Sequence, residues 1–296
     1  MRIGTAEAES TFLAQGQALA GVLIERGVEG PIDVLLSPSA SIDNANRLEA
    51  GEIDLGYMAA NWIGRARRGE APFRQPIDLR MVAPMNAGPL FFIVRSDSGL
   101  RTFDDLRGRR VCVGHRTSGM TQHSHTMLAA LGLSHADIVP VFLSFAEGAE
   151  ALAHGDIDAQ LQCPIPNKVM SALDARVGLR VISYAPGQLE VMLAKVPFYR
   201  RVVMRKGALR ALDADSAQPG VLNVLVTHAR ADAQMVKGVA GAIHAGAHDL
   251  VAANALYAGL PELFEPLKTQ GVAALAFDGV VLHDGAVAAY RKAGLL

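Results

Sequence analysis

Short apolar blocks alternate along the chain with longer segments in which apolar residues recur at helical spacing. Besides a first strand and turn at residues 1–5, the blocks predict strands at residues 32–36, 53–58, 80–83, 91–95, 110–113, 138–142, 157–162, 180–183 and 221–226. Short apolar strands that are separated by helices are typical of a largely parallel α/β sheet.

Three of the predicted helices carry clear start signals. The first covers Thr11–Arg26, with Ser10 or Thr11 as its N-cap. The second is expected at residues 42–50, directly after Ser41, and the third begins with a capping box at residues 144–147. These side chains satisfy the N–H groups that a helix leaves open in its first turn.

An internal repeat indicates two related halves. Residues 48–55 recur as residues 152–159, 104 positions later, and both copies leave a helix at a glycine and enter a strand through an acidic residue, Ile and Asp. A weaker echo pairs residues 3–5 with 113–115, 110 positions later. The repeat predicts two similar α/β lobes. Ligands of such sheets bind beyond the carboxyl ends of the strands, where helix N-termini favour carboxylate or phosphate.

Composition narrows the class of protein. The chain has 296 residues, of which half are hydrophobic, and a net charge of −1. This length suits two lobes, and the near-zero charge argues against a nucleic-acid partner. No apolar run reaches the length of a membrane helix. The first residues lack the basic and apolar regions of a signal peptide, so the chain is either cytosolic or a mature form.

The sequence offers little for metal or covalent chemistry. Cys112 and Cys163 are too few for a disulfide framework or a four-ligand zinc site and are expected to be buried thiols. His244 and His248 lie four residues apart on a predicted helix, without a third ligand. No nucleophile elbow, zinc-protease helix, phosphate loop or dinucleotide fingerprint occurs. We therefore expect no metal, no cofactor and no catalytic residues.

Several motifs, taken in order, resemble those of one transport family. They are residues 3–5 with 16–20, 41–44 with 48–56, 94–100 with 104–111, Gly114 with 118–119, and 130–133. This order resembles the TAXI-type solute receptors of tripartite ATP-independent periplasmic (TRAP) transporters. The similarity covers about residues 2–230 clearly and the C-terminal part loosely.

The resemblance implies a type II periplasmic-binding-protein fold: two similar α/β lobes joined by crossover hinge strands. Lobe 1 would comprise residues 1–86 and 208–296, and lobe 2 residues 87–207. Such a receptor is not an enzyme. It closes around a small organic acid or amino-acid-like solute in the periplasm and delivers it to the membrane subunits of the transporter.

Three loops depart from the family pattern. The first, residues 6–13, carries Glu7 and Glu9, and the loop after the second lobe 1 strand reads Ala-Ala-Asn-Trp at residues 59–62. The carboxylates of Glu7 and Glu9 would repel an anionic group or attract a cationic one. The low polarity of Phe12 and of residues 59–62 instead favours a solute with an apolar body and one carboxylate. Arg116, in the segment 114–121, is the predicted carboxylate clamp, because its planar guanidinium can pair with both oxygens.

The candidate solute contacts lie in the loops that follow the predicted strands. In lobe 1 they are Thr5, Ser10, Thr11, Ser39, Ala40, Ser41, Asn61 and Trp62; in lobe 2 they are His115, Arg116, Thr117, Ser118, Gly119, Met120, Thr121, Gln162 and Cys163. Each has an ordinary structural alternative, such as helix capping for Ser10 and Ser41 or packing for Trp62.

Two other functions remain open at this point. One is a cytosolic transferase, lyase or hydrolase with the same bilobal architecture, since a fold does not determine a function. The other is a cytosolic ligand sensor, which would have a partner protein instead of membrane subunits.

Overall fold

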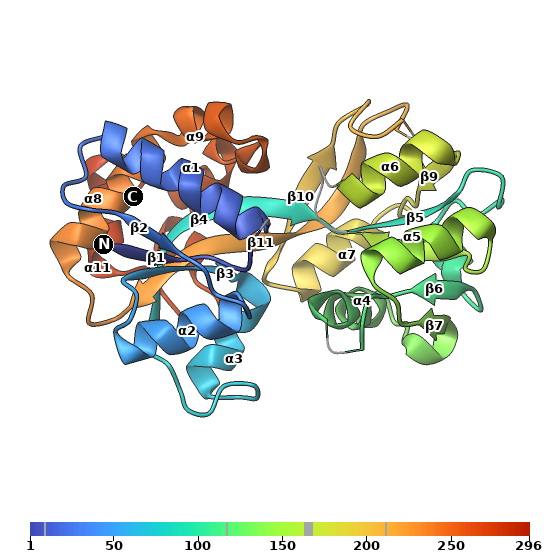
Figure 1. The fold of residues 1–296 in the computed structure, drawn as a ribbon, viewed down its shortest axis with the longest axis horizontal. Helices are drawn as coiled ribbons and strands as arrows, with labels where there is room; N and C mark the ends of the chain where they lie inside the picture. The colour runs from blue at the N-terminus through green and yellow to red at the C-terminus, as the bar shows by residue number, and fades with distance from the viewer. Residues whose placement is uncertain (9, 117, 163–167, 211) are drawn as a thin grey trace. The chain divides into compact units, whose positions relative to one another are not determined.

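The computed structural model describes residues 1–8, 10–116, 118–162, 168–210 and 212–296. The chain divides into two compact units: unit 1 contains residues 1–87 and 222–296, and unit 2 contains residues 88–221. The two boundaries fall within β4 (Leu79–Pro89) and β11 (Ser216–His228), so each of these long strands has residues in both units (Figure 1).

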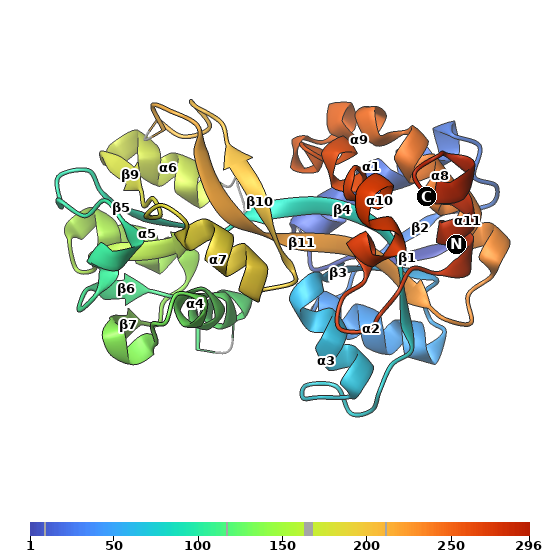
Figure 2. The ribbon, with the colours of Figure 1, turned by 180° about the vertical axis from the view of Figure 1, so that it is seen from behind.

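Unit 1 is built around a sheet whose strand order includes β11-β3-β1-β2, with β4 also paired to β11. Its other elements are β1 (Arg2–Gly4), α1 (Thr11–Glu25), β2 (Asp33–Leu35), α2 (Ser41–Ala50), β3 (Leu55–Ala59), α3 (Ile63–Arg68), α8 (Ala233–Ala245), α9 (Ala247–Ala253), α10 (Pro266–Gln270) and α11 (Asp284–Lys292). Helices α8 and α11 lie side by side at the edge of this unit (Figure 2).

Helices α1 and α2 cover opposite faces of the unit 1 sheet. A Cβ atom on Gly4 would lie 2.2 Å from Asn44 Oδ1 of α2, whereas one on Gly16 of α1 would lie 2.5 Å from the side chain of Thr5. Because successive strand residues point to opposite faces, Gly4 receives one helix and Thr5 the other. Small residues at these positions let both helices approach the sheet closely.

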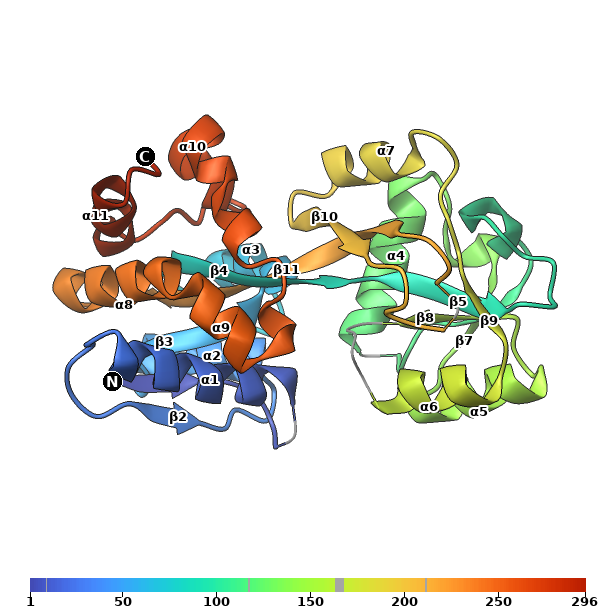
Figure 3. The same ribbon diagram turned by 90° about the horizontal axis from the view of Figure 1, so that it is seen from above.

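Unit 2 has a five-stranded sheet in the order β7-β6-β8-β5-β9. Its elements are β5 (Phe91–Arg95), β6 (Arg110–Cys112), α4 (Gly119–Ala130), β7 (Val139–Val141), α5 (Phe145–His154), β8 (Ala159–Gln162), α6 (Lys168–Arg176), β9 (Leu179–Val181), α7 (Gln188–Lys195) and β10 (Tyr199–Met204). Helices α4 and α7 lie on one side of the sheet and α5 and α6 on the other (Figure 3). Strand β10 pairs with residues 216–221 of β11.

Each unit encloses its own apolar core. In unit 1, Ile3, Leu19 and Leu55 are fully buried between the helices and the sheet, and in unit 2 Phe91 and Leu152 are. Within the described residues, no helix is long and apolar enough to cross a membrane.

The predicted α/β fold class is confirmed, but the expectation of a largely parallel sheet is wrong. Among the described strands, β2-β1-β3 in unit 1 and β7-β6-β8 in unit 2 pair in parallel. Strand β11 runs antiparallel to β3, and β5 runs antiparallel to both of its neighbours. Apolar runs report that a strand is buried and carry no information on its direction.

The internal repeat corresponds to a shared set of hydrogen bonds, which is first seen in unit 1. The backbone N–H of Arg2 donates to the carboxylate of Asp54 at 2.7 Å. The guanidinium of Arg2 donates to the same carboxylate and to the carbonyl oxygen of Gly51 at 3.0 Å. Gly51 ends α2 with a φ of 72°, a conformation that glycine adopts without strain.

Unit 2 repeats this arrangement. The backbone N–H of Arg110 donates to Asp158 at 2.8 Å, and its guanidinium reaches Asp158 and the carbonyl oxygen of Gly155, both at 2.8 Å. Arg110 stands 108 positions after Arg2, as Ser118, the N-cap of α4, stands 108 after Ser10, the N-cap of α1. The predicted offset of 110 between residues 3–5 and 113–115 is therefore wrong by two residues. It aligned Gly4 with Gly114, whereas the shared hydrogen bonds and helix caps are 108 positions apart.

We expect Asp158→Asn to lower the free energy of unfolding by about 1 kcal/mol at pH 7. Hydrogen bonds from the Arg110 side chain hold the pKa of Asp158 below its usual value of 3.8. A carboxylate whose pKa is lowered by folding stabilises the fold above its unfolded pKa and loses that contribution as the pH falls through the folded pKa. Urea unfolding should therefore show a difference at pH 7 that shrinks as the pH falls below 3.8 and disappears once the carboxylate of the folded protein is protonated. The exposed Asp156→Asn is the control, and an equal loss in both variants would contradict the assignment.

Candidate functional site

Unit 1 gathers the predicted contacts at one edge of its sheet. Strands β2, β1 and β3 are parallel neighbours, so the loops that follow them meet at the same edge. The described residues at this edge include Thr5 after β1, Ser10 and Thr11 at the start of α1, Ser39 and Ala40 after β2, Ser41 at the start of α2, and Asn61 and Trp62 after β3.

Three of these hydroxyl groups are occupied within the unit. Ser10 caps α1, as predicted, by accepting the backbone N–H of Leu13 at 3.2 Å. Thr5 is fully buried, and its hydroxyl donates to the carbonyl oxygen of Leu35 at 2.8 Å. Ser41 was expected to cap α2, but it is the first helical residue, and Ala40 with a φ of 45° is the N-cap. The Ser41 hydroxyl instead accepts the backbone N–H of Ala59 at 3.0 Å. Ser41 therefore ties the end of β3 to α2.

Asn61 and Trp62 differ in whether their side chains already have partners within unit 1. The indole of Trp62 packs edge-on against Phe73, with ring centroids 6.3 Å apart, and the Arg65 guanidinium lies 5.2 Å from the indole centroid. Trp62 is thus held by its own unit. Asn61 Oδ1 is buried without a hydrogen-bond partner in the described structure. Since buried polar atoms are nearly always paired, this oxygen is a candidate for a solute contact.

Unit 2 presents a second edge, at the carboxyl ends of the parallel strands β7, β6 and β8. The predicted residues His115, Arg116, Ser118, Gly119, Met120 and Thr121 lie between β6 and the first turn of α4, and Gln162 is the last residue of β8. Two further predicted contacts, Thr117 and Cys163, lie outside the described residues.

The loop before α4 is shaped by two buried or capping side chains. Ser118 caps the helix by accepting the backbone N–H of Thr121 at 3.2 Å. Thr121 is buried, and its hydroxyl lies within hydrogen-bonding distance of the carbonyl oxygens of Val113 (3.1 Å) and His115 (2.6 Å). These bonds tie the first turn of α4 to the residues that follow β6. The side chains of His115 and Arg116 are exposed.

Arg116 is held against an aromatic ring that sequence reasoning did not select. Its guanidinium carbon lies 4.0 Å from the centroid of Phe142, which follows β7. A cation over a ring face is attracted by the ring quadrupole, which limits the directions that the guanidinium can take. Phe142 could have been selected from the sequence, because it stands directly after the second of the three parallel strands of this unit.

Gln162 is the most unusual side chain at this edge. It is completely buried, and both its amide nitrogen and its amide oxygen lack hydrogen-bond partners among the described residues. Gln160, two residues earlier and therefore on the same face, donates from its amide nitrogen to the carbonyl oxygen of Phe145 at 3.0 Å, so only its amide oxygen is unpartnered among the described residues. An unpaired buried amide is costly, and a ligand that offers both an acceptor and a donor would satisfy it.

Sequence reasoning also missed buried amides in unit 1. Gln15 Nε2 on α1 and Asn86 Oδ1 on β4 are buried and unpartnered within the described residues. Neither residue follows a strand, so the loop rule that selected the other candidates did not apply to them.

Metal and nucleophile chemistry find no support in the described parts of the chain. No group of three His, Cys, Asp or Glu residues there could hold a metal ion. His244 and His248, which were expected on one helix, lie on α8 and α9, which are separated at Gly246. Cys112 is buried as predicted, and burial raises the pKa of its thiol, which keeps it protonated.

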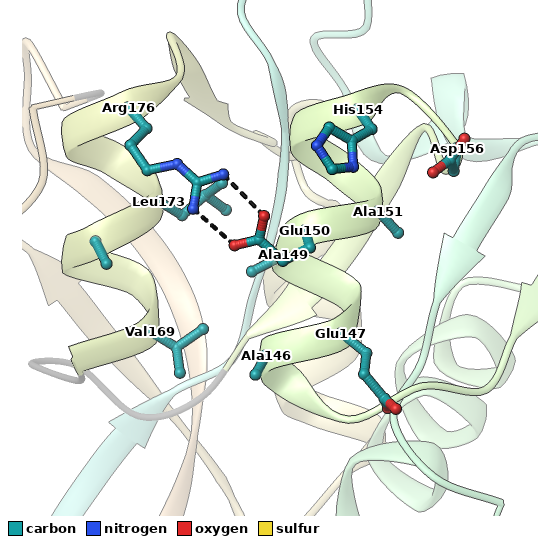
Figure 4. A pocket seen from close by; sticks show the side chains of 11 residues that line it. Ala146, Glu147, Ala149, Glu150, Ala151, His154, Asp156, Val169, Leu173 and Arg176 are labelled. Carbon is teal, nitrogen blue, oxygen red and sulfur yellow. Dashed lines mark hydrogen bonds and ion pairs between the residues drawn. The ribbon is translucent and has the colours of Figure 1, made fainter.

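A separate open groove runs between α5 and α6 of unit 2 (Figure 4). Its volume is about 640 Å³, and Arg176 crosses it to form two hydrogen bonds with Glu150, at 2.7 and 2.8 Å. Its apolar side chains, such as Val169 and Leu173, are flanked by the exposed groups Glu147 and His154 (Figure 4). Of the predicted solute contacts that the structure describes, none lines this groove.

Comparison with known proteins places the chain among binding-protein folds. A family model described as the NMT1-like family matches residues 3–294. The chain is similar to a TctC solute binding protein from Polaromonas, with a TM-score of 0.57 and 14% identity over 99% of this chain and 95% of that one. It is also similar to the periplasmic aliphatic sulphonate binding protein SsuA from Escherichia coli, with a TM-score of 0.53 and 18% identity over 100% and 90% of the two chains. A periplasmic sulfonate-binding protein SsuA from Methylobacillus flagellatus KT gives a TM-score of 0.56 and 16% identity over 100% and 87%. At these identities the likeness shows the fold.

Proposed function

Because this chain belongs to the NMT1-like family, we propose that it is a non-catalytic solute-binding receptor of a transport system. The two units would act as the two lobes of such a receptor and would both contact the solute. The names of the similar structures, which are periplasmic or solute binding proteins, support this proposal and a periplasmic location. Within this class, the order of the sequence motifs favours a TAXI-type receptor that works with TRAP membrane subunits.

The observation that carries the proposal is the buried, unpartnered amide of Gln162 at the carboxyl edge of the unit 2 sheet, where Arg116 also lies. A buried amide without partners destabilises the folded state. A solute that completes its hydrogen bonds would remove this cost, so the amide is better explained by solute binding than by a purely structural role. The exposed guanidinium of Arg116 adds a positive charge suited to a carboxylate or another planar or tetrahedral anion. The solute class proposed is therefore a small organic acid or an amino-acid-like molecule.

Mass spectrometry of the protein purified under native conditions tests this proposal directly, together with thermal unfolding against a library of carboxylates, amino acids and sugar acids. A bound solute stabilises the folded state by about 2.7 kcal/mol when its concentration is a hundred times its Kd. A stabilising compound that is recovered unchanged supports the receptor. Turnover of a compound, or no stabilisation by any member of the library, would contradict it.

For an anionic solute found in this way, we expect Arg116→Ala to weaken binding roughly 10- to 100-fold, since a hydrogen bond to a charged group contributes about 1.5–3 kcal/mol. Titration calorimetry measures the change. Arg109→Ala, an exposed arginine of the same unit, is the matched control and should leave the affinity unchanged. Equal affinity of the Arg116→Ala variant and the native protein would remove Arg116 from the site.

A further inference from the structure

Two histidines of unit 2 have their rings in face-to-face contact. His125 lies on α4, and His135 begins the short 3-10 helix His135–Asp137. The ring centroids are 3.6 Å apart and the planes are inclined by 28°. His125 is exposed and His135 is half-buried. Neither ring belongs to the candidate solute contacts or to the groove between α5 and α6.

Ser124 connects His135 to α4. The Ser124 Oγ atom lies 3.0 Å from the carbonyl oxygen of Thr121, to which it can donate, and 2.7 Å from Nε2 of His135. In this shorter contact either the hydroxyl or the imidazole can be the donor. One nitrogen of the His135 ring is therefore held by a hydrogen bond to α4.

The stacked pair is connected to the predicted solute clamp through one aromatic ring. The ring of His135 meets that of Phe142 edge-on, with centroids 6.5 Å apart and an interplanar angle of 70°. The guanidinium of Arg116 lies 4.0 Å from the centroid of the same Phe142 ring. His135 is thus one of the side chains against which Phe142 rests, and Phe142 supports Arg116.

Two positive charges on these rings would repel each other, because the ring centroids are only 3.6 Å apart. Arg116 adds a positive charge over the Phe142 ring, which His135 also contacts. Burial, and then the neighbouring charge of His125, lower the pKa of His135 from its ordinary value of 6.5. The folded state therefore favours the neutral ring, and this contribution to stability is lost as the pH falls below the ordinary value.

Most of the other described titratable groups on the surrounding elements are already paired, hydrogen-bonded or buried. Asp137 in the same 3-10 helix is paired with Arg107 at 2.9 Å. Lys195 of α7 donates to a carbonyl oxygen at the end of α4. Burial lowers the pKa of His123, on α4, to about 4, so it stays neutral in weak acid. Strand β7 contributes only apolar side chains. His115, beside Arg116, is the one further imidazole of the loop and needs its own control.

We propose that the His125–His135 stack is a proton-operated support for Arg116. At neutral pH the stacked rings hold Phe142, and with it the guanidinium, in one place. In weak acid His135 takes up a proton and the two rings separate, Phe142 loses a supporting contact, and Arg116 moves away from the Phe142 ring. The consequence for solute binding, a dependence of affinity on pH at this edge, rests on the proposed function.

Nuclear magnetic resonance of the full chain without added solute tests the device. Signals of the Arg116 side chain, shifted by the Phe142 ring current, are followed from pH 8 to pH 5. In the native protein this ring-current shift should be lost with the titration of His135. In His135→Phe, which keeps an aromatic ring but cannot take up a proton, the shift should persist throughout. His115→Gln and the distant His154→Gln should behave like the native protein.

Two results would overturn the proposal: Arg116 signals that do not move while His135 titrates, or signals that move equally in His135→Phe. Where that variant is disturbed in its fold, His125→Phe provides a second test. It keeps the stack but removes one of the two charges, so His135 should titrate at a higher pH than in the native protein. An unchanged titration would contradict the coupling. Because no solute is present, these outcomes are independent of whether the receptor function holds.

Discussion

Replacement of Asn44 by alanine is expected to lower the free energy of unfolding by about 3–4 kcal/mol. Asn44 is completely buried. Its amide nitrogen lies within hydrogen-bonding distance of the carbonyl oxygens of Thr5 (2.7 Å) and Tyr57 (2.9 Å), and its amide oxygen accepts from Ser37 Oγ at 2.6 Å. Alanine would leave three buried polar groups without this partner and open a small cavity between α2 and the sheet.

Urea unfolding of Asn44→Ala measures this loss, and Asn46→Ala is the matched control. Asn46 is exposed on the same helix, so its replacement should change stability by no more than about 0.5 kcal/mol. Similar losses in the two variants would show that the buried hydrogen bonds contribute little. Because Asn44 links the end of β1 to the middle of β3, its replacement should also loosen the edge that carries the unit 1 candidates.

The two units solve the same packing problem with different residues. In unit 1 the amide between helix and sheet comes from the helix, as Asn44, and a Cβ atom on Gly56 of β3 would lie 3.0 Å from its Cβ. In unit 2 the repeat places Gly148 at the position of Asn44. There the amide comes from the strand, as Gln160, whose nitrogen lies 2.5 Å from where a Gly148 Cβ atom would stand. One buried amide is kept in each unit while its chain position has changed.

This exchange explains part of what the sequence could and could not predict. Repeated glycines and aspartates indicated the duplicated helix and strand, because a left-handed C-cap and a paired Arg–Asp anchor require particular residue types. The exchange of Asn44 for Gly148, and of Gly56 for Gln160, could not be recognised in the sequence, because a glycine and an amide residue at equivalent positions look unrelated. The partners of Asn44 are distant in sequence and are brought together only by folding.

Strand β10 shows a second limit of sequence patterns. Its residues include two consecutive arginines, Arg200 and Arg201, so it does not form an apolar block. It is a strand because it pairs with residues far along the chain, such as Tyr199 with Val221. Pairing between distant segments overrides local preference. For the same reason the antiparallel direction of β5 and the full lengths of β4 and β11 could not be predicted.

The candidate site was predictable in position but not in chemistry. The rule that solutes bind beyond the carboxyl ends of strands selected residues at the edges where the parallel strands of each unit end. It could not distinguish Thr5 and Thr121, whose hydroxyl groups are occupied inside their units, from Gln162 and Asn61, whose buried amide atoms are unpartnered in the described structure. That difference depends on the partners that folding supplies to each side chain.

Replacement of Gly285 by alanine is expected to lower the free energy of unfolding by about 2–4 kcal/mol, because Gly285 lies at the contact between α8 and α11. A Cβ atom on Gly285 would lie 2.3 Å from the carbonyl oxygen of Ala233 and 2.9 Å from the backbone nitrogen of Lys237. Both contacts are to the backbone of α8, which cannot rotate away as a flexible side chain would. The helices must separate to admit the methyl group, and the buried Val236 and Tyr290 would lose part of their packing.

Other glycines of the same helix pair provide matched controls with the opposite sign. A Cβ atom on Gly241 of α8 would lie 3.9 Å from Ala289 Cβ, an ordinary contact, and one on Gly238 would meet nothing within 4 Å. Alanine in a helix interior is favoured over glycine by about 1 kcal/mol, so Gly238→Ala and Gly241→Ala should stabilise unit 1. Urea unfolding of the three variants decides the matter. If Gly285→Ala were as stable as Gly241→Ala, the close approach of α11 to the α8 backbone would not be a constraint on this fold.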